Sequence, residues 1–273
     1  MKLTVKKTIL RGIYLVIFSL FIATVLPTCS SLNVFPISKD KELGTQFDAE
    51  IRNDPKTYPI LNNAAARSYV QGIIDQIKRS PDVKYAGQFP YVVQIINDDK
   101  TVNAFCTPGG YIYVYTGLLK VLDNEAALAG VLGHEIAHAE LRHSTSRMTK
   151  AMGVQALLDI LANNTTSTTI NFTANAFAGI GLLKNSRDDE SEADDFSFRY
   201  LMATKWYPGS IIYFFEKVRG RGGSGLEELF STHPLPQSRI DETIARLKKN
   251  NTPPPTEAQL NARGYADFKR TLK

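Results

Sequence analysis

The chain has 273 residues, 43% of them hydrophobic, and a formal net charge of +5, which is ordinary for a globular protein of one large or two small domains. Four basic residues and no acidic residue lie in the first 29 positions, so the remainder carries a net charge of only +1. This balance gives no support to nucleic-acid binding. The only cysteines are Cys29 and Cys106, which argues against a disulfide framework.

The first 28 residues have the pattern of a bacterial export signal. The basic stretch MKLTVKKTILR precedes an uncharged run over residues 12–26, which is short for a membrane span and fits the apolar region of a signal peptide. The run ends in LPTCSS, in which Leu26 stands three residues before Cys29, as in the lipobox of lipoproteins. We therefore expect cleavage before Cys29 and acylation of that cysteine.

Two alternatives stay open, because Pro27 and Thr28 depart from the small residues usual in a lipobox. They are an ordinary cleaved signal and an uncleaved N-terminal anchor. All three interpretations place the rest of the chain on the periplasmic side of the bacterial cell envelope. Ser30 offers no acidic retention signal, so we expect a lipid anchor in the outer membrane.

Two helices and a small sheet are expected next. Helical spacing covers about residues 35–54 and 62–80, and two prolines lie between them. The segments PYVVQII, TVNAFC and GYIYVYTG are rich in β-branched and aromatic residues and are separated by the turn sequences NDDK and TPGG. They predict three short strands in antiparallel arrangement. In the third strand, Ile112 and Val114 face one way and the tyrosines 111, 113 and 115 face the other.

Helices dominate the remainder, so the expected class is α+β and mainly helical. Asp123 or Asn124 can cap a helix whose run AALAGVLG has no polar side chain, which predicts burial on every side. Residues 162–173, rich in Thr and Asn, are expected to form a loop. Further helices are predicted over residues 186–202, 209–218 and 236–249, and Thr256 with Gln259 can cap a last short helix after the linker NNTPPP.

Three of the four histidines lie in GHEIAHAELRH, residues 133–143. His134, Glu135 and His138 form the pattern H-E-x-x-H. Residues i and i+4 share a helix face, so both imidazoles can bind one zinc ion at about 2.0–2.1 Å, and Glu135 is placed to accept a proton from a zinc-bound water. The alternative, a helix with surface histidines, disagrees with the apolar run before it, because ionisable groups buried without a partner are costly.

A catalytic zinc ion needs a third protein ligand and an open fourth position. His143 lies off the ligand face and falls one residue short of the third histidine in H-E-x-x-H-x-x-G-x-x-H, so we expect an exposed helix histidine. Glu190 is the better candidate, since it falls on the inward stripe of its acidic helix. Asp194, one turn further, is placed to hold a ligand imidazole from behind. The alternative for this segment is a solvated charged face.

Together these segments resemble the HtpX and CAAX prenyl protease 1 family of zinc metallopeptidases. HEIAH is followed, 52 residues after His138, by the acidic motif that begins at Glu190. The resemblance runs from about residue 39 to 247 and includes ELG at 42–44, NAF at 103–105, PGGYIYVYTGLL at 108–119, SRDDESEAD at 186–194 and STHPLPQSRI at 231–240. It implies Glu190 as the third ligand. It also implies a gluzincin-like zincin fold, with a small three-stranded or mixed sheet over the metal-binding helix.

The resemblance assigns a role to the predicted strands. NAF and GYIYVYTG resemble the strand that borders the cleft in gluzincins, where an extended peptide adds as a further strand through backbone hydrogen bonds. This implies substrate contacts at Asn103, Ala104, Tyr111 and Tyr113. A plain internal strand is the alternative.

The resemblance also bears on STHPLPQSRI. In exported relatives a histidine in this motif can occupy the fourth zinc position from a loop and keep the enzyme latent, which implies that role for His233 and a later one at the oxyanion. A simple loop histidine is the alternative. Arg239 either stabilises the same oxyanion or forms an ion pair with a carboxylate.

The predicted organisation is a lipoprotein-type signal (1–28), a tether (29–36), a zinc metallopeptidase domain (37–250) and a Pro-rich linker with a short C-terminal helix (251–273). The expected function is hydrolysis of peptide bonds in misfolded envelope proteins, with one zinc ion per chain. The expected partners are an extended or unfolded polypeptide, the membrane through a lipid or N-terminal anchor, and the envelope assembly machinery.

Other functions fit the sequence less well. A periplasmic chaperone or assembly factor with a structural or vestigial metal would keep the edge strand, but Glu135 has no use in a structural zinc site. A small-molecule metallohydrolase has no need of a peptide-like edge strand. An integral prenyl-protein protease requires several long apolar spans, which this sequence lacks.

Overall fold

A computed structural model describes residues 33–152, 185–219, 225–234 and 237–272. Residues 33–273 form one compact unit. The predictions for the signal at 1–28, for Cys29 and for the loop at 162–173 lie outside the described residues. Within the described part of the chain, no helix combines the length and the apolar character that crossing a membrane requires.

The sheet has three strands, β1 (Val92–Ile96), β2 (Ala104–Thr107) and β3 (Tyr111–Tyr115), in the order β1-β3-β2. Strands β2 and β3 form an antiparallel hairpin, but β1 pairs with β3 in parallel. The prediction of an all-antiparallel sheet is therefore wrong. NDDK does not close a hairpin; residues 97–103 carry the chain past the position of β3, and β3 then returns between its two neighbours. As a result β2 lies at one edge of the sheet.

Two glycines explain how the hairpin turn packs. Pro108–Gly110 form a 3-10 turn, in which Gly109 has a φ of 74° that favours glycine. The helix α2 (Ile37–Asn53) crosses this turn at Gly44, where an added Cβ would lie 2.1 Å from the carbonyl oxygen of Pro108. The ELG segment, residues 42–44, therefore lies where α2 packs closely against the turn after β2.

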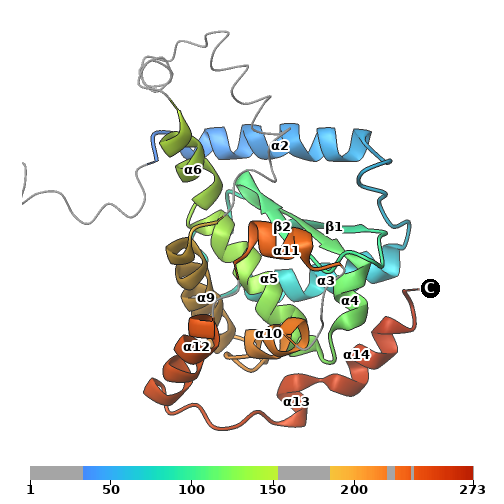
Figure 1. The fold of residues 1–273 in the computed structure, drawn as a ribbon, viewed down its shortest axis with the longest axis vertical. Helices are drawn as coiled ribbons and strands as arrows, with labels where there is room; N and C mark the ends of the chain where they lie inside the picture. The colour runs from blue at the N-terminus through green and yellow to red at the C-terminus, as the bar shows by residue number, and fades with distance from the viewer. Residues whose placement is uncertain (1–32, 153–184, 220–224, 235–236, 273) are drawn as a thin grey trace, which may run out of the picture. The chain divides into compact units, whose positions relative to one another are not determined.

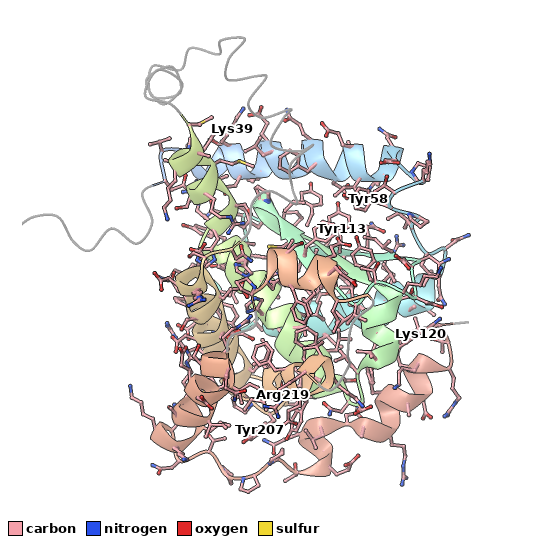
Figure 2. The ribbon with its side chains drawn as sticks, viewed as in Figure 1. Lys39, Tyr58, Tyr113, Lys120, Tyr207 and Arg219 are labelled. Carbon is pink, nitrogen blue, oxygen red and sulfur yellow. The ribbon has the colours of Figure 1, made fainter. Side chains whose placement is uncertain are left out.

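The two faces of the sheet are covered differently. Ile112 and Val114 belong to the main hydrophobic core, whereas Tyr113 and Tyr115 pack in a second cluster with Phe105, so the predicted alternation is confirmed. Figure 2 shows Tyr113 on the side of the sheet that α2 covers, where its hydroxyl donates to Asp48 of α2 at 2.7 Å.

The central helix is α5 (Glu125–Glu140), and all of its residues are buried. Asn124 caps it by accepting from the amide of Ala127, as the sequence predicts. Figure 1 shows α5 passing through the middle of the molecule, with other helices around it. These are α3 (Ala64–Ile77), α4 (Thr116–Val121), α6 (His143–Ala151), α9 (Arg187–Met202), α10 (Ile211–Arg219), α11 (Glu227–Thr232), α12 (Gln237–Lys249), α13 (Glu257–Leu260) and α14 (Ala262–Lys269).

The predicted class, α+β and mainly helical with a small mixed sheet, is confirmed. The short helices α4, α6 and α11 were not expected from the sequence. The capping box of Thr256 and Gln259 is present at α13. Beyond it, Tyr265 and Phe268 of α14 enter the main core, so the C-terminal segment packs on the same unit as the helices before it.

Candidate metal centre

Close packing of α5 against α9 creates the centre. At Gly133 an added Cβ would lie 2.7 Å from Oγ of Ser197, and this hydroxyl donates to the carbonyl of Gly130 at 2.9 Å. Because the apolar run includes residues with small side chains, α9 packs directly against the backbone of α5. Ser186 and Asp189 form a capping box that starts α9, and Glu190 follows on the face turned toward His134.

Four buried side chains bring their donor atoms together. Ligand atoms of His134, His138, Glu190 and His233 all lie within 4.8 Å of one another, and these residues form the group in the described chain that could hold a metal ion. The two Nε2 atoms of His134 and His138 are 2.9 Å apart. Oxygen atoms of Glu190 lie 3.5 Å from the first and 3.2 Å from the second.

These separations fit a zinc ion. Tetrahedral coordination with metal–nitrogen distances of about 2.0–2.1 Å separates neighbouring donor atoms by roughly 3.3 Å. The donor set of two imidazoles and one carboxylate is typical of catalytic zinc sites. His233 lies beside this donor set, with its Nδ1 3.0 Å from Oε1 of Glu190. The structure thus brings the predicted ligand residues into one cluster.

Each histidine of H-E-x-x-H has a partner behind it. Nδ1 of His134 lies 2.9 Å from Asp194, where the sequence places such a partner. Nδ1 of His138 lies 2.7 Å from Nδ1 of His143. Such contacts fix the tautomer and the orientation of a ligand imidazole.

The expectation that His143 is exposed is wrong. Its side chain is 1% exposed. The expectation extended one helix through residue 143, but α5 ends at Glu140 and Arg142 adopts a left-handed backbone with φ 57°. The new helix α6 therefore starts at His143 and turns that ring back onto His138.

Arg239 lies among carboxylates. Its Nε and Nη2 contact the two oxygens of Asp194 at 2.6 and 2.7 Å, and its Nη1 lies 2.6 Å from Oε2 of Glu190. A bidentate pair of this kind is a strong charge-assisted contact. The sequence left two roles open for Arg239, stabilising the oxyanion or forming an ion pair with a carboxylate. The structure shows the ion pair.

The charges in the cluster set its pKa values. Burial alone would raise the pKa of Glu190, but the charges of His233, His134 and Arg239 outweigh it and hold this pKa well below 4.5. Burial lowers the pKa of His134, yet Glu190 and Asp194 raise it to about 9. Burial and the charge of His134 hold the pKa of His138 well below 6.5. Burial raises the pKa of Glu135, which favours a proton-accepting role.

A cleft opens beside the donors. It is lined by Glu135, His138, His233 and the edge residues Phe105–Pro108, among others. Nε2 of His233 lies 3.7 Å from Oε1 of Glu135. Glu135 and His233 therefore face the same space.

The outer edge of β2, which pairs with no further strand in the described part of the chain, borders this cleft. The amide of Tyr115 donates to the carbonyl of Asn103, so alternate residues bond to β3, and Ala104 and Cys106 turn their backbone groups outward. The side chain of Asn103 accepts from the amide of Ala104 at 2.9 Å. Tyr111 and Tyr113 instead lie on the central strand, and their hydroxyls contact α2, so the structure does not bring these two side chains to the edge.

Sequence reasoning missed two residues in this region. Asn185, which immediately precedes the cap of α9, places Nδ2 2.6 Å from Oε1 of Glu190 and 3.3 Å from Nε2 of His138. Cys106 is a free cysteine on the edge strand, and burial raises its pKa well above 9.0. Neither belongs to a motif with a recognisable spacing, so no sequence signal identifies them.

Comparison with known proteins gives consistent matches. A family model described as peptidase family M48 matches residues 64–246. Over 237 residues the chain is 27% identical to the beta-barrel assembly-enhancing protease of Escherichia coli, covering 82% of this chain and 47% of that protein. It is 33% identical over 161 residues to metalloprotease YcaL of Escherichia coli, covering 58% of this chain and 61% of YcaL.

A mitochondrial relative extends the comparison. The chain is 32% identical over 145 residues to the mitochondrial metalloendopeptidase OMA1 of Arabidopsis thaliana, covering 53% of this chain and 29% of OMA1. The chain spans about half the length of the assembly-enhancing proteases that it matches. These matches confirm the family resemblance that the motifs carry.

Proposed function

The chain belongs to peptidase family M48, and from this premise we propose that it is a zinc-dependent endopeptidase acting on extended segments of unfolded or misfolded envelope proteins. The observation that carries the proposal is the cluster of His134, His138 and Glu190 with the buried Glu135 beside the same cleft. A structural metal site requires only the ligands, whereas Glu135 adds a proton acceptor.

The chemistry divides between the ion and the chain. A zinc ion held by His134, His138 and Glu190 would supply Lewis-acid chemistry, lowering the pKa of water and polarising a carbonyl. Glu135 accepts the proton and passes it to the leaving amine, for which its raised pKa is suited. Asp194 and His143 keep the two ligand imidazoles in place through their Nδ1 atoms.

Substrate binding uses the edge of β2. The carbonyl of Ala104 and the amide and carbonyl of Cys106 point away from β3, and Cys106 lines the cleft, so an extended peptide can pair with this edge as an added strand. Backbone pairing gives affinity for unfolded chains with little dependence on sequence. Asn103 supports this edge by engaging the amide of Ala104.

His233 is the candidate for control of the site. It follows α11 directly, and its ring centroid lies 5.4 Å from those of both His134 and His138. In this position it would act as a further ligand of the metal and restrict access, so activity would require its displacement. Once displaced, it can stabilise the oxyanion. Arg239 supports the site by holding Glu190 and Asp194.

The location of the protein is part of the proposal. The pattern at residues 1–28 favours export, and acylation of Cys29 would anchor the chain to the periplasmic face of the outer membrane. The similarity to a protease whose name refers to beta-barrel assembly supports action near the machinery that assembles envelope proteins. Globomycin, which blocks lipoprotein signal cleavage, should make the unprocessed precursor accumulate, and an unchanged mature form would remove the lipoprotein assignment.

One experiment tests the activity. Purified protein should degrade casein, and both a zinc chelator and Glu135→Gln should stop the degradation. A chaperone with a vestigial metal site would instead suppress aggregation of unfolded proteins equally well with either residue at position 135. Casein degradation that persists in the Glu135→Gln protein would refute the assigned mechanism.

A further inference from the structure

One arginine that lines the cleft has an incomplete set of partners among the described residues. Arg147, on α6, lines the same cleft as Glu135 and His138. Its side chain is only 16% exposed. Neither Nε nor Nη1 has a hydrogen-bond partner among the described residues, and Nη2 makes only a long contact of 3.4 Å to Ser144.

The nearby acidic residue does not satisfy this cation. Oδ2 of Asp189 is 3.5 Å from Nη1, but the same oxygen accepts from the amide of Ser186 at 3.0 Å in the capping box. Burial lowers the pKa of Arg147 from its ordinary value, and the charge of Asp189 offsets this only in part. An arginine cannot shed its proton in a protein, so Arg147 stays a mostly buried cation with N–H donors that no described residue accepts.

Arg239, the other arginine near the candidate metal ligands, is paired with carboxylates. Arg239 forms contacts of 2.6–2.7 Å with two carboxylates. Leaving buried donors unpaired is unfavourable, more so for a charged group. Arg147 thus keeps unpaired N–H donors in the wall of the cleft, and a planar fork of N–H donors matches a carboxylate best.

The surroundings specify where that carboxylate comes from. Cys106 and Pro108 at the end of β2 line the same cleft, together with the apolar side chains of Phe47, Phe105 and Met148. A peptide paired with the β2 edge would pass these residues on one side of the candidate metal ligands. Its side chains then meet an apolar wall with one cation in it.

We propose that Arg147 is a specificity-determining residue that binds a carboxylate of the peptide substrate near the bond to be cleaved. This inference rests on the proposed endopeptidase function. It names the substrate class as peptides with an acidic group a few residues from that bond. The carboxylate has two chemical sources, an Asp or Glu side chain and the free C-terminus of the peptide.

The test uses peptides with blocked ends, derived from one neutral sequence that the protein cleaves. Glu is placed in turn at each of four positions on either side of the bond, with Gln at the same position as the reference. A further peptide keeps the neutral sequence and has a free C-terminal carboxylate. At one position kcat/KM should be about tenfold higher for Glu than for Gln, the range expected of a hydrogen bond to a charged group.

Variants assign the preference to Arg147. Arg147→Gln should reduce the Glu-to-Gln ratio to about twofold or less, and Arg147→Lys should retain part of it because the charge remains. Arg187→Gln is the matched control, since Arg187 is exposed on the first turn of α9 and loses the same charge. A preference that is absent from the wild type, or unchanged in Arg147→Gln, overturns the proposal. A preference lost equally in Arg187→Gln also overturns it.

A binding measurement separates this inference from the activity. The dissociation constants of the labelled Glu and Gln peptides are measured on the Glu135→Gln protein, with and without Arg147→Gln. Tighter binding of the Glu peptide that depends on Arg147 supports the inference even if no peptide is cleaved, an outcome that would remove the endopeptidase proposal alone. Tighter binding only of the peptide with the free C-terminus identifies the chain end as the source. Equal binding of all peptides overturns the inference.

Discussion

The Nδ1 atoms of His138 and His143 lie 2.7 Å apart, and Nε2 of His143 lies 3.3 Å from Glu192. For His138 to bind a metal through Nε2, its Nδ1 must carry the proton and donate it to His143. The other nitrogen of His143 then donates toward Glu192. Of the two histidines proposed as ligands, His138 is thus held by the imidazole of His143, whereas His134 is held by the carboxylate of Asp194.

Removal of that imidazole should weaken metal binding. We expect His143→Ala to raise the zinc dissociation constant by about 10–100-fold, the usual effect of losing a partner behind a ligand. His143→Asn should lose less, because the amide oxygen can accept from Nδ1 of His138. Competition with a chromogenic chelator measures the constants. Equal zinc affinity in the wild type and His143→Ala would show that His143 only fills space.

Arg239 should matter strongly for stability. In the metal-free protein, Arg239→Gln leaves Asp194 and Glu190 buried without their cation, which should cost about 3–5 kcal/mol of unfolding free energy. Arg246→Gln is the control, because Arg246 pairs at 2.9 Å with the more exposed Asp195 and surface pairs contribute about 1 kcal/mol or less. Urea unfolding in the presence of a chelator compares the two. Similar losses would contradict the buried pairing.

The ion pairs of Arg239 with Glu190 and Asp194 should also make the stability loss in Arg239→Gln depend on pH. The pKa values of Glu190 and Asp194 are held below 4.5 and 3.8, against burial, by charges that include Arg239. Depressed carboxyl pKa values stabilise the folded state above the unfolded pKa, and this stability is lost as the pH falls through the folded pKa. The gap in unfolding free energy between the wild type and Arg239→Gln should therefore be full at pH 7 and shrink as the pH falls from about 4.5 toward 3. A gap that stays constant over this range would exclude the ion pair as its origin.

Two glycines should respond oppositely to substitution by alanine. Gly44→Ala places a Cβ 2.1 Å from the carbonyl oxygen of Pro108, and such overpacking typically costs about 1–3 kcal/mol. At Gly72, inside α3, an added Cβ meets nothing within 4 Å. Gly72→Ala should stabilise by roughly 0.4–1 kcal/mol, because it restricts the unfolded chain. Denaturation midpoints provide the measurement, and a stable Gly44→Ala protein would mean that α2 does not contact the hairpin turn closely.

Local patterns in the sequence could be read directly, and contacts between distant segments could not. The i, i+4 spacing of His134 and His138, the cap at Asn124 and the alternation in β3 each depend on neighbours along the chain. The strand order depends on where residues 97–103 lead, which no local preference determines. The parallel pairing of β1 with β3 therefore escaped prediction.

The site shows the same limit. Glu190 could be proposed because an inward stripe on a helix is a local signal, and the family motif supported it. His143 could not be placed, because the left-handed residue Arg142 redirects the chain between α5 and α6. Asn185 and Arg147 carry no motif, and only the folded arrangement of α6, α9 and β2 makes them neighbours of the cleft.

The central claim is that Glu135 performs the proton transfer at a zinc ion held by His134, His138 and Glu190. The most direct measurement is the rate of casein cleavage by Glu135→Gln protein that has been shown to contain zinc. The account predicts one zinc ion per chain, as in the wild type, and no detectable cleavage. Cleavage at the wild-type rate by this zinc-loaded variant would contradict it.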